Sequence, residues 1–397
     1  MSLAASALVE SQDRERSSVI FVRIFHSIHS LFPHHQRSTM SNSFSATQAE
    51  SKLAKAAEFV PILDDQLFEY AGRLKDKVVI ITGAANGIGK ESAMRFASFG
   101  AKIVIGDLDV VGAEKTVAEI RASGGQAVAR RCNVTVWEDQ EELFELAMKT
   151  FGSVDVVVPN AGITETGNFL QVQFDKSGKA QKPNLATIQV NLVGVLYTVH
   201  LAQHYLLVNS DGTVQDGART LKAIVLIGSM ASWQGIPHAP NYSAAKHGVL
   251  GLMRSLEPDM TLRGIRIACI TPFFADTGIV DASARVLLAG IPLTPVPRIA
   301  GAIIYAASHP DPATSGSGYA LPDDGPVYQV PKEVFKMGVY KLLDSRLKNV
   351  GGIVYVARLI KDIAKLTTKP LLASALVLWL SRAIWQNRVL LQRSLGL

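Results

Sequence analysis

The chain has 397 residues, of which 48% are hydrophobic and 19% are charged, as expected for a folded protein with a sizeable core. Two cysteines, Cys132 and Cys269, are too few for a disulfide framework and lack zinc-ligand spacing, so we expect two small buried residues and no metal site. The net charge is +6, but residues 332–397 hold twelve Lys and Arg against three Asp and Glu, and the rest is slightly acidic. This distribution argues against nucleic acid as a partner.

Residues 1–60 are predicted to form a poorly ordered N-terminal extension. They are rich in Ser, Ala and His, and the apolar run SVIFVRIF is too short to span a bilayer. A mitochondrial presequence is typically rich in Arg and poor in acids, whereas Glu10, Asp13 and Glu15 interrupt this stretch. We therefore expect a cytoplasmic protein rather than a mitochondrial one.

Residues 61–330 are predicted to form one α/β domain. Short β-branched runs alternate with helical stretches, and the runs are KVVIIT, KIVIGD, VDVVVP, KAIVLIG and IRIACIT. Such alternation predicts parallel strands with crossover helices on both faces. We expect a Rossmann-type, doubly wound parallel sheet of about seven strands.

Residues 331–397 are predicted to form a basic, apolar, helical C-terminal extension. Residues 371–380 are apolar apart from Ser374, and as a helix this run covers roughly 15 Å, about half of a bilayer core. Two interpretations remain open. Residues 369–393 contact an anionic membrane surface, or they pack against the domain or a partner subunit.

The first strand continues into TGAANGIG, which predicts a phosphate-binding turn. Gly83, Gly87 and Gly89 let the backbone turn tightly and approach a diphosphate, and the following helix offers free N–H groups at its N-terminus. Asn86 and Ile88 lie in the same turn and belong to the predicted cofactor site.

The second strand ends in Asp107, eighteen residues beyond Gly89, close to the spacing expected for an acid that binds ribose. A carboxylate there accepts hydrogen bonds from the ribose hydroxyls of NAD and repels the 2′-phosphate of NADP, so we predict NAD as the cofactor. Asn133 and its neighbour Val134 follow the third strand. Asn133 either contacts adenine or only shapes the loop.

Five motifs then occur in order: TGAANGIG, PNAG (159–162), VNLVG (190–194), IGS (227–229) and YSAAK (242–246). Their order and spacing resemble the short-chain dehydrogenase/reductase family over roughly residues 75–325. Within that family the sequence looks most like NAD-dependent hydroxyprostaglandin-dehydrogenase-type members, because of Asp107 and the segment TPFFADT.

The motifs also predict a catalytic group. Hydride transfer from a secondary alcohol needs a base for the hydroxyl proton, and Tyr242 and Lys246 share one helix face at i and i+4. We expect the Lys246 ammonium to lower the pKa of Tyr242. Ser229, at the carboxyl end of a strand, would hold the substrate oxygen, although such a serine is often only a helix cap.

The resemblance implies further roles. Asn191 would hold a water that links Lys246 to solvent, although by its type and place it could be only a satisfied buried amide. Thr277 would hold the nicotinamide carboxamide, and the domain would pair through two helices into a homodimer or homotetramer. Three residues of the PNAG motif would line the adenine ribose: Asn160, Ala161 and Gly162.

The predicted function is an NAD-dependent oxidoreductase that interconverts a lipophilic secondary alcohol and its ketone. The apolar and aromatic segment 273–296 motivates the lipophilic substrate, because in the resembling family this segment covers the substrate. Two alternatives remain: a carbonyl reductase of a biosynthetic pathway, and a non-catalytic, membrane-associated scaffold that binds a nucleotide.

Overall fold

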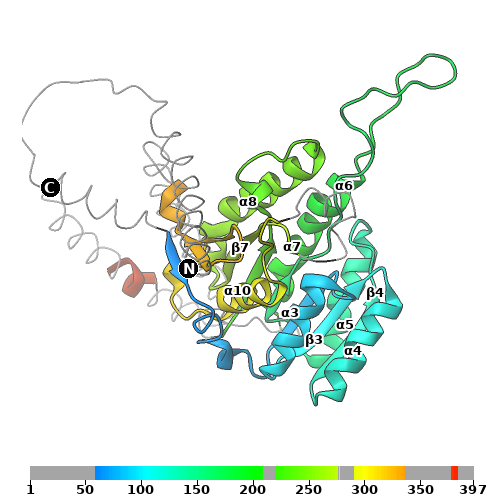
Figure 1. Cartoon of the computed structure of the whole chain (residues 1–397). Helices are drawn as coiled ribbons and strands as arrows, with labels where there is room; N and C mark the ends of the chain where they lie inside the picture. The colour runs from blue at the N-terminus through cyan, green and yellow to red at the C-terminus, as the bar shows by residue number, and fades with distance from the viewer. Residues whose placement is uncertain (1–58, 209–219, 276, 278–289, 336–376, 383–397) are drawn as a thin grey trace, which may run out of the picture. The chain divides into compact units, whose positions relative to one another are not determined.

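The computed structural model describes residues 59–208, 220–275, 277, 290–335 and 377–382. Its centre is a nine-stranded sheet in the order β1-β9-β8-β7-β6-β5-β2-β3-β4 (Figure 1). The strands are β1 (Val60–Ile62), β2 (Val78–Thr82), β3 (Lys102–Asp107), β4 (Gln126–Arg131), β5 (Val156–Val158), β6 (Ala223–Ile227), β7 (Arg266–Pro272), β8 (Gly318–Leu321) and β9 (Val327–Val330).

The strands from β4 to β8 are parallel, and the strand order reverses between β2 and β5. This reversal is where open α/β sheets bind ligands, beyond the carboxyl ends of the strands. The prediction of a doubly wound parallel sheet is confirmed. The short strands β9 and β1 add an antiparallel edge that the sequence analysis did not anticipate.

Helices cover both faces of the sheet (Figure 1). The α-helices are α3 (Gly87–Ser98), α4 (Val110–Ala122), α5 (Trp137–Phe151), α6 (Ala186–Ile188), α7 (Gly194–Tyr205), α8 (Pro240–Leu262) and α10 (Val296–Ser308). The 3-10 turns are η1 (Ala71–Leu74), η3 (Met230–Ser232), η4 (Pro312–Thr314) and η5 (Lys332–Phe335), and η2 (Gln189–Val193) is a π-helical turn.

Alternating strand residues divide the core into two layers. Val79 and Ile81 pack with α3, α4 and α10, whereas Val78 and Ile80 pack with α5, α7 and α8. This is the period of two that strands impose on their side chains. Cys132 and Cys269 are both buried, as predicted, and burial raises the pKa of each thiol to about 12.

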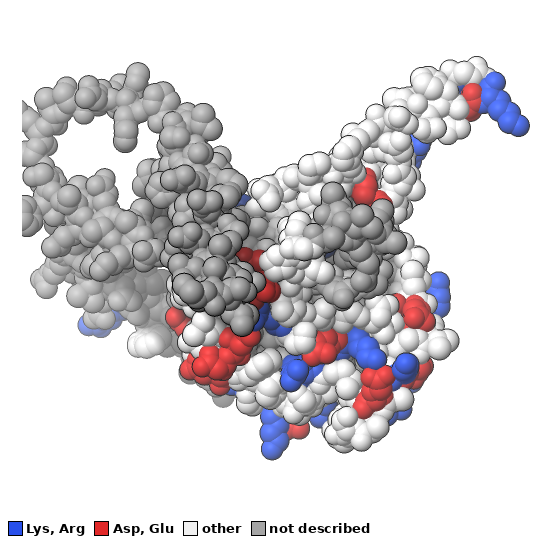
Figure 2. All heavy atoms as spheres, in the orientation of Figure 1, with Lys and Arg blue, Asp and Glu red and all other residues white. Residues whose placement is uncertain are grey.

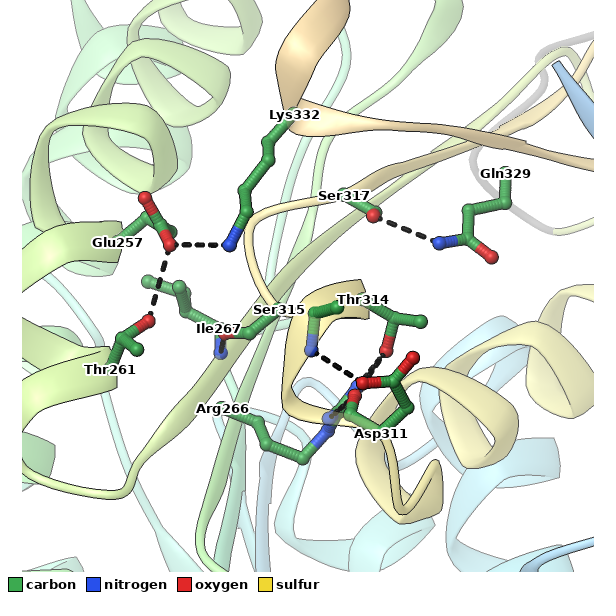
Figure 3. Close-up of polar contacts among 11 residues, drawn as sticks. Glu257, Thr261, Arg266, Ile267, Asp311, Thr314, Ser315, Ser317, Gln329 and Lys332 are labelled. Atoms are coloured by element: carbon green, nitrogen blue, oxygen red, sulfur yellow. Dashed lines mark hydrogen bonds and ion pairs between the residues drawn. The ribbon is translucent and has the colours of Figure 1, made fainter. Parts of the chain in front are cut away.

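Polar contacts join the residue that begins η5 to α8, and the start of β7 to the η4 turn (Figure 3). Lys332 follows β9 and its Nζ donates to Glu257 Oε1 on α8 at 2.8 Å, and Glu257 also accepts from Thr261 at 3.2 Å. Arg266, at the start of β7, donates to the carbonyl of Asp311 and to Thr314 Oγ1. The chain therefore leaves the sheet at a fixed point beside α8.

Residues 167–184 form an exposed hairpin, which we call the arm. Gly167 has φ +75°, and Phe174 pairs with Ala180 around a turn in which Asp175 N donates to Lys179 O at 2.9 Å. The arm extends away from the sheet near α6 (Figure 1), and charged atoms appear on it mainly towards its tip (Figure 2). Its exposed large apolar residues are Phe169, Leu170, Val172 and Phe174.

Most of the two predicted extensions lies outside the described residues. Val60 begins β1, and residues 377–382 are helical. Among the described residues, no helix has the length and apolar character needed to cross a membrane.

Candidate active site

The glycine turn has the shape that a diphosphate requires. Gly83 and Gly87 have φ values of +70° and +57°, in the left-handed region that favours glycine. A Cβ on Gly89 would lie 2.1 Å from Gly83 O and 2.5 Å from Asn160 Nδ2, so no side chain fits there. Asn86 occupies the N-cap position of α3 without a side-chain cap, and this helix end therefore remains open to an anion.

The PNAG motif is bonded to this turn. Asn160 Nδ2 donates to Thr82 O at 3.0 Å and to Gly83 O at 2.8 Å, and Ala161 N donates to Thr82 Oγ1 at 3.1 Å. A Cβ on Gly83 would lie 2.6 Å from Ala161 Cα. In this structure the side chain of Asn160 holds the glycine turn in shape, which is a different task from the predicted lining of the ribose.

Asp107 lies beside the same turn. Its Oδ2 accepts from Ala85 N at 2.8 Å and its Oδ1 accepts from Asp109 N at 3.0 Å, which fixes the carboxylate at the end of β3. Each oxygen keeps a second lone pair for a ribose hydroxyl. Together the glycine turn, the open end of α3 and this carboxylate fit a dinucleotide.

Of the remaining predicted cofactor residues, Thr277 lies beside the glycine turn, whereas Asn133 makes a hydrogen bond within its own loop. Thr277 lies at the glycine turn, because a Cβ on Gly87 would come within 3.6 Å of Thr277 Cβ. Asn133 Oδ1 instead accepts from Thr135 N at 3.1 Å, the loop-forming role that was the alternative for this residue. Val134 is 7% exposed and Ile88 packs against the core. Much of segment 273–296 lies outside the described residues.

Ser229 and Tyr242 are brought together at the carboxyl edge of the sheet. Ser229 follows β6 and caps η3, where its Oγ accepts from Ala231 N at 3.1 Å. The Ser229 hydroxyl also lies close enough to the phenol to lower the pKa of Tyr242, and it donates to Pro272 O at 3.5 Å. Ser229 therefore caps η3 and also lies beside the phenol.

Lys246 lies beneath the ring of Tyr242. It is 6% exposed, its Nζ is 5.6 Å from the centroid of the Tyr242 ring, and it donates to Ile227 O at 2.8 Å. Burial lowers the pKa of Lys246 to about 8. The amine of Lys246 is thus buried and hydrogen-bonded to a neutral carbonyl.

The predicted lowering of the pKa of Tyr242 is wrong for this structure. Burial raises the pKa of Tyr242, and the hydrogen bond from Ser229 opposes that rise only in part. The physical reason is that the ammonium of Lys246 faces the ring and donates to a carbonyl, while removing the phenol from water disfavours its charged form.

Asn191 is fully buried in η2 and bonds to one residue with both ends of its amide. Its Oδ1 accepts from Ile163 N and its Nδ2 donates to Ile163 O, each at 2.8 Å. Gly162 lies against the same side chain, since a Cβ there would be 3.3 Å from Asn191 Oδ1. Asn191 is thus a satisfied buried amide in this structure, and the water that it was expected to hold remains a prediction.

We call residues 163–166 the anchor loop, because side chains from two helices hold it. Asn191 holds Ile163, and Thr187 on α6 accepts from Thr166 N at 3.1 Å and donates to Thr164 O at 3.0 Å. The fourth residue, Glu165, accepts from Tyr242 N through Oε2 at 2.7 Å.

Sequence reasoning missed Glu165. A signal was available, because α8 begins Ala239-Pro240, and Ala239 has no side chain that could cap the helix. A helix that contains the predicted catalytic tyrosine and lacks its own cap needs a partner from elsewhere in the chain.

The chain matches the family described as short chain dehydrogenase over residues 77–286, more than half of its length. It is 33% identical over 210 residues to cyclohexanol dehydrogenase from Acinetobacter sp., covering 53% of this chain and 77% of that protein. It is also 31% identical over 242 residues to a 3-oxoacyl-[acyl-carrier-protein] reductase from Synechocystis sp., covering 60% of this chain and 91% of that protein.

A similar fold occurs in a short-chain type dehydrogenase/reductase from Mycobacterium marinum, with a TM-score of 0.55 and 24% identity over 64% of this chain and 97% of that chain. The matched residues 77–286 include the glycine turn, Ser229, Tyr242 and Lys246. This protein therefore belongs to the short-chain dehydrogenase family of oxidoreductases.

Proposed function

We propose that this oxidoreductase uses NAD to interconvert a lipophilic secondary alcohol and its ketone, with Tyr242 as the acid and base. The observation that carries the proposal is that Ser229, Tyr242 and the buried Lys246 lie close together at the carboxyl edge of the sheet, with Lys246 Nζ 5.6 Å from the centroid of the Tyr242 ring. There, Ser229 would hold the substrate oxygen and Tyr242 would exchange a proton with it.

The choice of NAD rests on Asp107. Its carboxylate is held beside the glycine turn and would meet the ribose of the adenosine half, where a 2′-phosphate would be repelled. When bound, NAD supplies the hydride acceptor. The glycine turn and the end of α3 would hold the diphosphate, and Thr277 would hold the carboxamide.

The test measures NADH formation with a panel of secondary alcohols, with cyclohexanol as the first probe. We expect turnover with NAD⁺ well above that with NADP⁺, and a loss of about 100-fold or more in kcat for Tyr242→Phe. Preference for NADP⁺ would overturn the choice of cofactor. Full activity of Tyr242→Phe would overturn the mechanism, and no turnover of any alcohol or ketone would favour the scaffold interpretation.

A second candidate is a ketone reductase that works in the opposite direction. The specific observation in its favour is the raised pKa of Tyr242, because a phenol that keeps its proton is ready to donate it to a carbonyl oxygen. The relative named as a 3-oxoacyl reductase is consistent with this direction. Measuring both directions across pH separates them: reduction should persist at neutral pH, whereas oxidation should rise as the phenol deprotonates.

The hydroxyprostaglandin-dehydrogenase-type subgroup is part of the same proposal. Asp107 and the segment TPFFADT support it. A cyclic or long-chain secondary alcohol should therefore outperform ethanol by a large factor in kcat/KM. Equal use of small primary alcohols would argue against the subgroup.

We also propose that the domain forms a homodimer or homotetramer through α7 and α8. A hollow of about 400 Å³ lies on this face, and Leu196 beside it is 41% exposed. The hollow is lined by Trp137, Leu196, Tyr197, Val199, His200, Gln203, Leu252 and Leu256. Light scattering should show a dimer or tetramer, and Leu196→Asp should shift it towards the monomer.

Membrane contact through residues 369–393, in a protein of the cytoplasm, is the remaining proposal. The described part of that segment, residues 377–382, is helical, and Leu378 and Trp379 are 71% and 66% exposed. Deleting residues 369–393 should release the protein from anionic vesicles without loss of activity. Loss of the oligomer on deletion would support packing against protein instead.

A further inference from the structure

The N-terminus of α8 lacks a cap from its own sequence. Ala239 precedes the helix and makes no side-chain cap, and Pro240 at the first position has no N–H. Ser243 N is the first to bond back within the helix, to Ala239 O at 2.9 Å. Tyr242 N, one residue earlier, therefore needs an acceptor from outside the helix.

Glu165 supplies that acceptor. Its Oε2 lies 2.7 Å from Tyr242 N, a short distance typical of a hydrogen bond to an ionised group. A carboxylate at this place is also favoured by the positive end of the helix dipole. The contact joins residues 77 positions apart in the chain, so the fold brings this cap to the helix.

The carboxylate is itself held in place. The residues on both sides of Glu165 are bonded to Thr187, and Ile163 is bonded to Asn191. Its second oxygen, Oε1, is buried with no hydrogen-bond partner among the described residues. Glu165 therefore sits on a fixed loop and has one strong contact, to the backbone of the proposed catalytic tyrosine.

We propose that Glu165 is a positioning residue for Tyr242, acting through its hydrogen bond to the Tyr242 backbone N–H. This inference rests on the proposed function, in which Tyr242 moves the proton. A tyrosine backbone fixed at the first turn of α8 sets where the phenol lies relative to Ser229 and the substrate oxygen. A misplacement of about 1 Å can lower a rate by about 100-fold.

Three substitutions separate position from charge. Glu165→Ala removes the acceptor, and we expect kcat for cyclohexanol oxidation to fall about 10- to 100-fold while NADH binding, measured by fluorescence, is unchanged. Glu165→Gln keeps an acceptor at the same reach, so kcat should stay within about fivefold of the wild type. Glu165→Asp keeps the charge but shortens the reach, so kcat should fall nearly as far as in Glu165→Ala.

Glu114→Ala, an exposed glutamate on α4, is the matched control and should leave kcat unchanged. If Glu165→Ala turns over as fast as the wild type, or if Glu165→Asp is active while Glu165→Gln is not, the proposal is overturned. The second result would mean that charge is what matters. Either conclusion requires that Tyr242→Phe is inactive in the same assay, which separates a failure of this proposal from a failure of the proposed function.

A measurement that needs no substrate tests whether Glu165 fixes the backbone of Tyr242. Amide hydrogen exchange at residues 241–243 should be at least about tenfold faster in Glu165→Ala than in the wild type and close to the wild type in Glu165→Gln. Exchange in β2 and β3 should not change, which shows that each variant is folded. Equal exchange at residues 241–243 in all variants would overturn the proposal even if cyclohexanol is not turned over.

Discussion

The anchor loop and the arm are neighbours in the sequence, yet the structure treats them differently. Residues 163–166 are bonded to the side chains of Asn191 and Thr187 and to the backbone of Tyr242, whereas all of residues 167–184 are exposed. Apart from Asn184 at its end, which accepts from Asn241 and from Ala186 N, the hydrogen bonds of the arm lie within the arm. Composition does not predict which stretch is exposed, since the exposed arm contains more large apolar residues than the anchor loop. The difference lies in the partners, because Asn191, Thr187 and Tyr242 come from the helices that shape the site.

This comparison shows how a connection can be divided between two tasks. The anchor loop ties the helix of Asn191 to the helix of Tyr242, so its geometry is shared with the site. The arm begins immediately afterwards, and its only hydrogen bonds to the helices of the site among the described residues are those of Asn184 at its end. Substitutions that release the anchor loop or change the helix it caps should therefore have larger effects than substitutions in the arm.

Asn191→Leu should give the largest loss of stability, because it removes both hydrogen bonds that hold Ile163 in the anchor loop. Both the N–H and the C=O of Ile163 would lose their partner at a partly buried position, which we expect to lower the free energy of unfolding by about 2–5 kcal/mol. Urea unfolding checks this value. A change below about 0.5 kcal/mol would mean that water replaces the amide freely and that the loop is held by other contacts.

Lys246, on the helix that the anchor loop caps, should make stability depend on pH. Burial lowers its pKa to about 8 in the folded protein, whereas the ordinary pKa of lysine in the unfolded chain is 10.5. Below pH 8 both states are protonated and the burial penalty is complete. Between pH 8 and 10.5 the unfolded chain binds more protons, so the contribution of Lys246 to stability rises with pH, by about 3 kcal/mol in all.

The measurement compares the wild type with Lys246→Met by urea unfolding from pH 7.5 to 10.5. The difference in unfolding free energy, wild type minus variant, should increase across this range. Lys179→Met, in the exposed arm, serves as the matched control. A constant difference between wild type and Lys246→Met would show that the buried amine keeps its proton throughout.

Thr187→Val tests the second tie of the anchor loop with a side chain of nearly the same size. The fully buried Oγ1 accepts from Thr166 N and donates to Thr164 O, and valine can do neither. We expect a loss of about 1–2 kcal/mol in unfolding free energy and a moderate fall in kcat. If the unfolding free energy and kcat of Thr187→Val match the wild type, the anchor loop is held by Asn191 and Glu165 and not by Thr187.

The arm should give the smallest effect. Replacing Leu170, Val172 and Phe174 together by serine removes exposed apolar surface only, so each change should stay within about 0.5 kcal/mol. Thermal unfolding and turnover of cyclohexanol should both match the wild type. A loss of more than about 2 kcal/mol would show that the arm packs against protein in solution and that the comparison is wrong.

The sequence was sufficient for those parts of the molecule that depend on local pattern. The β-branched runs became parallel strands, and the glycine turn formed where TGAANGIG predicted it. The i,i+4 spacing placed Lys246 beneath Tyr242 because a helix imposes that arrangement on any such pair.

The parts that failed depend on contacts between distant residues. The pKa of Tyr242 is set by how deeply the fold covers the phenol, which spacing does not reveal. Asn191 was noticed as an amide in an apolar helix, but its partner, Ile163, could not be identified from the sequence. Strands β1 and β9 are too short to stand out until they pair with each other.

The ion pair between Lys332 and Glu257 joins the segment that follows β9 directly to α8. Lys332 comes two residues after the last strand, so a pull on the C-terminal segment reaches this contact before it reaches the sheet. Glu257 lies on α8, as do Tyr242 and Lys246. A force applied to the C-terminal segment would therefore act through Lys332 on the helix of the proposed catalytic tyrosine as well as on β9.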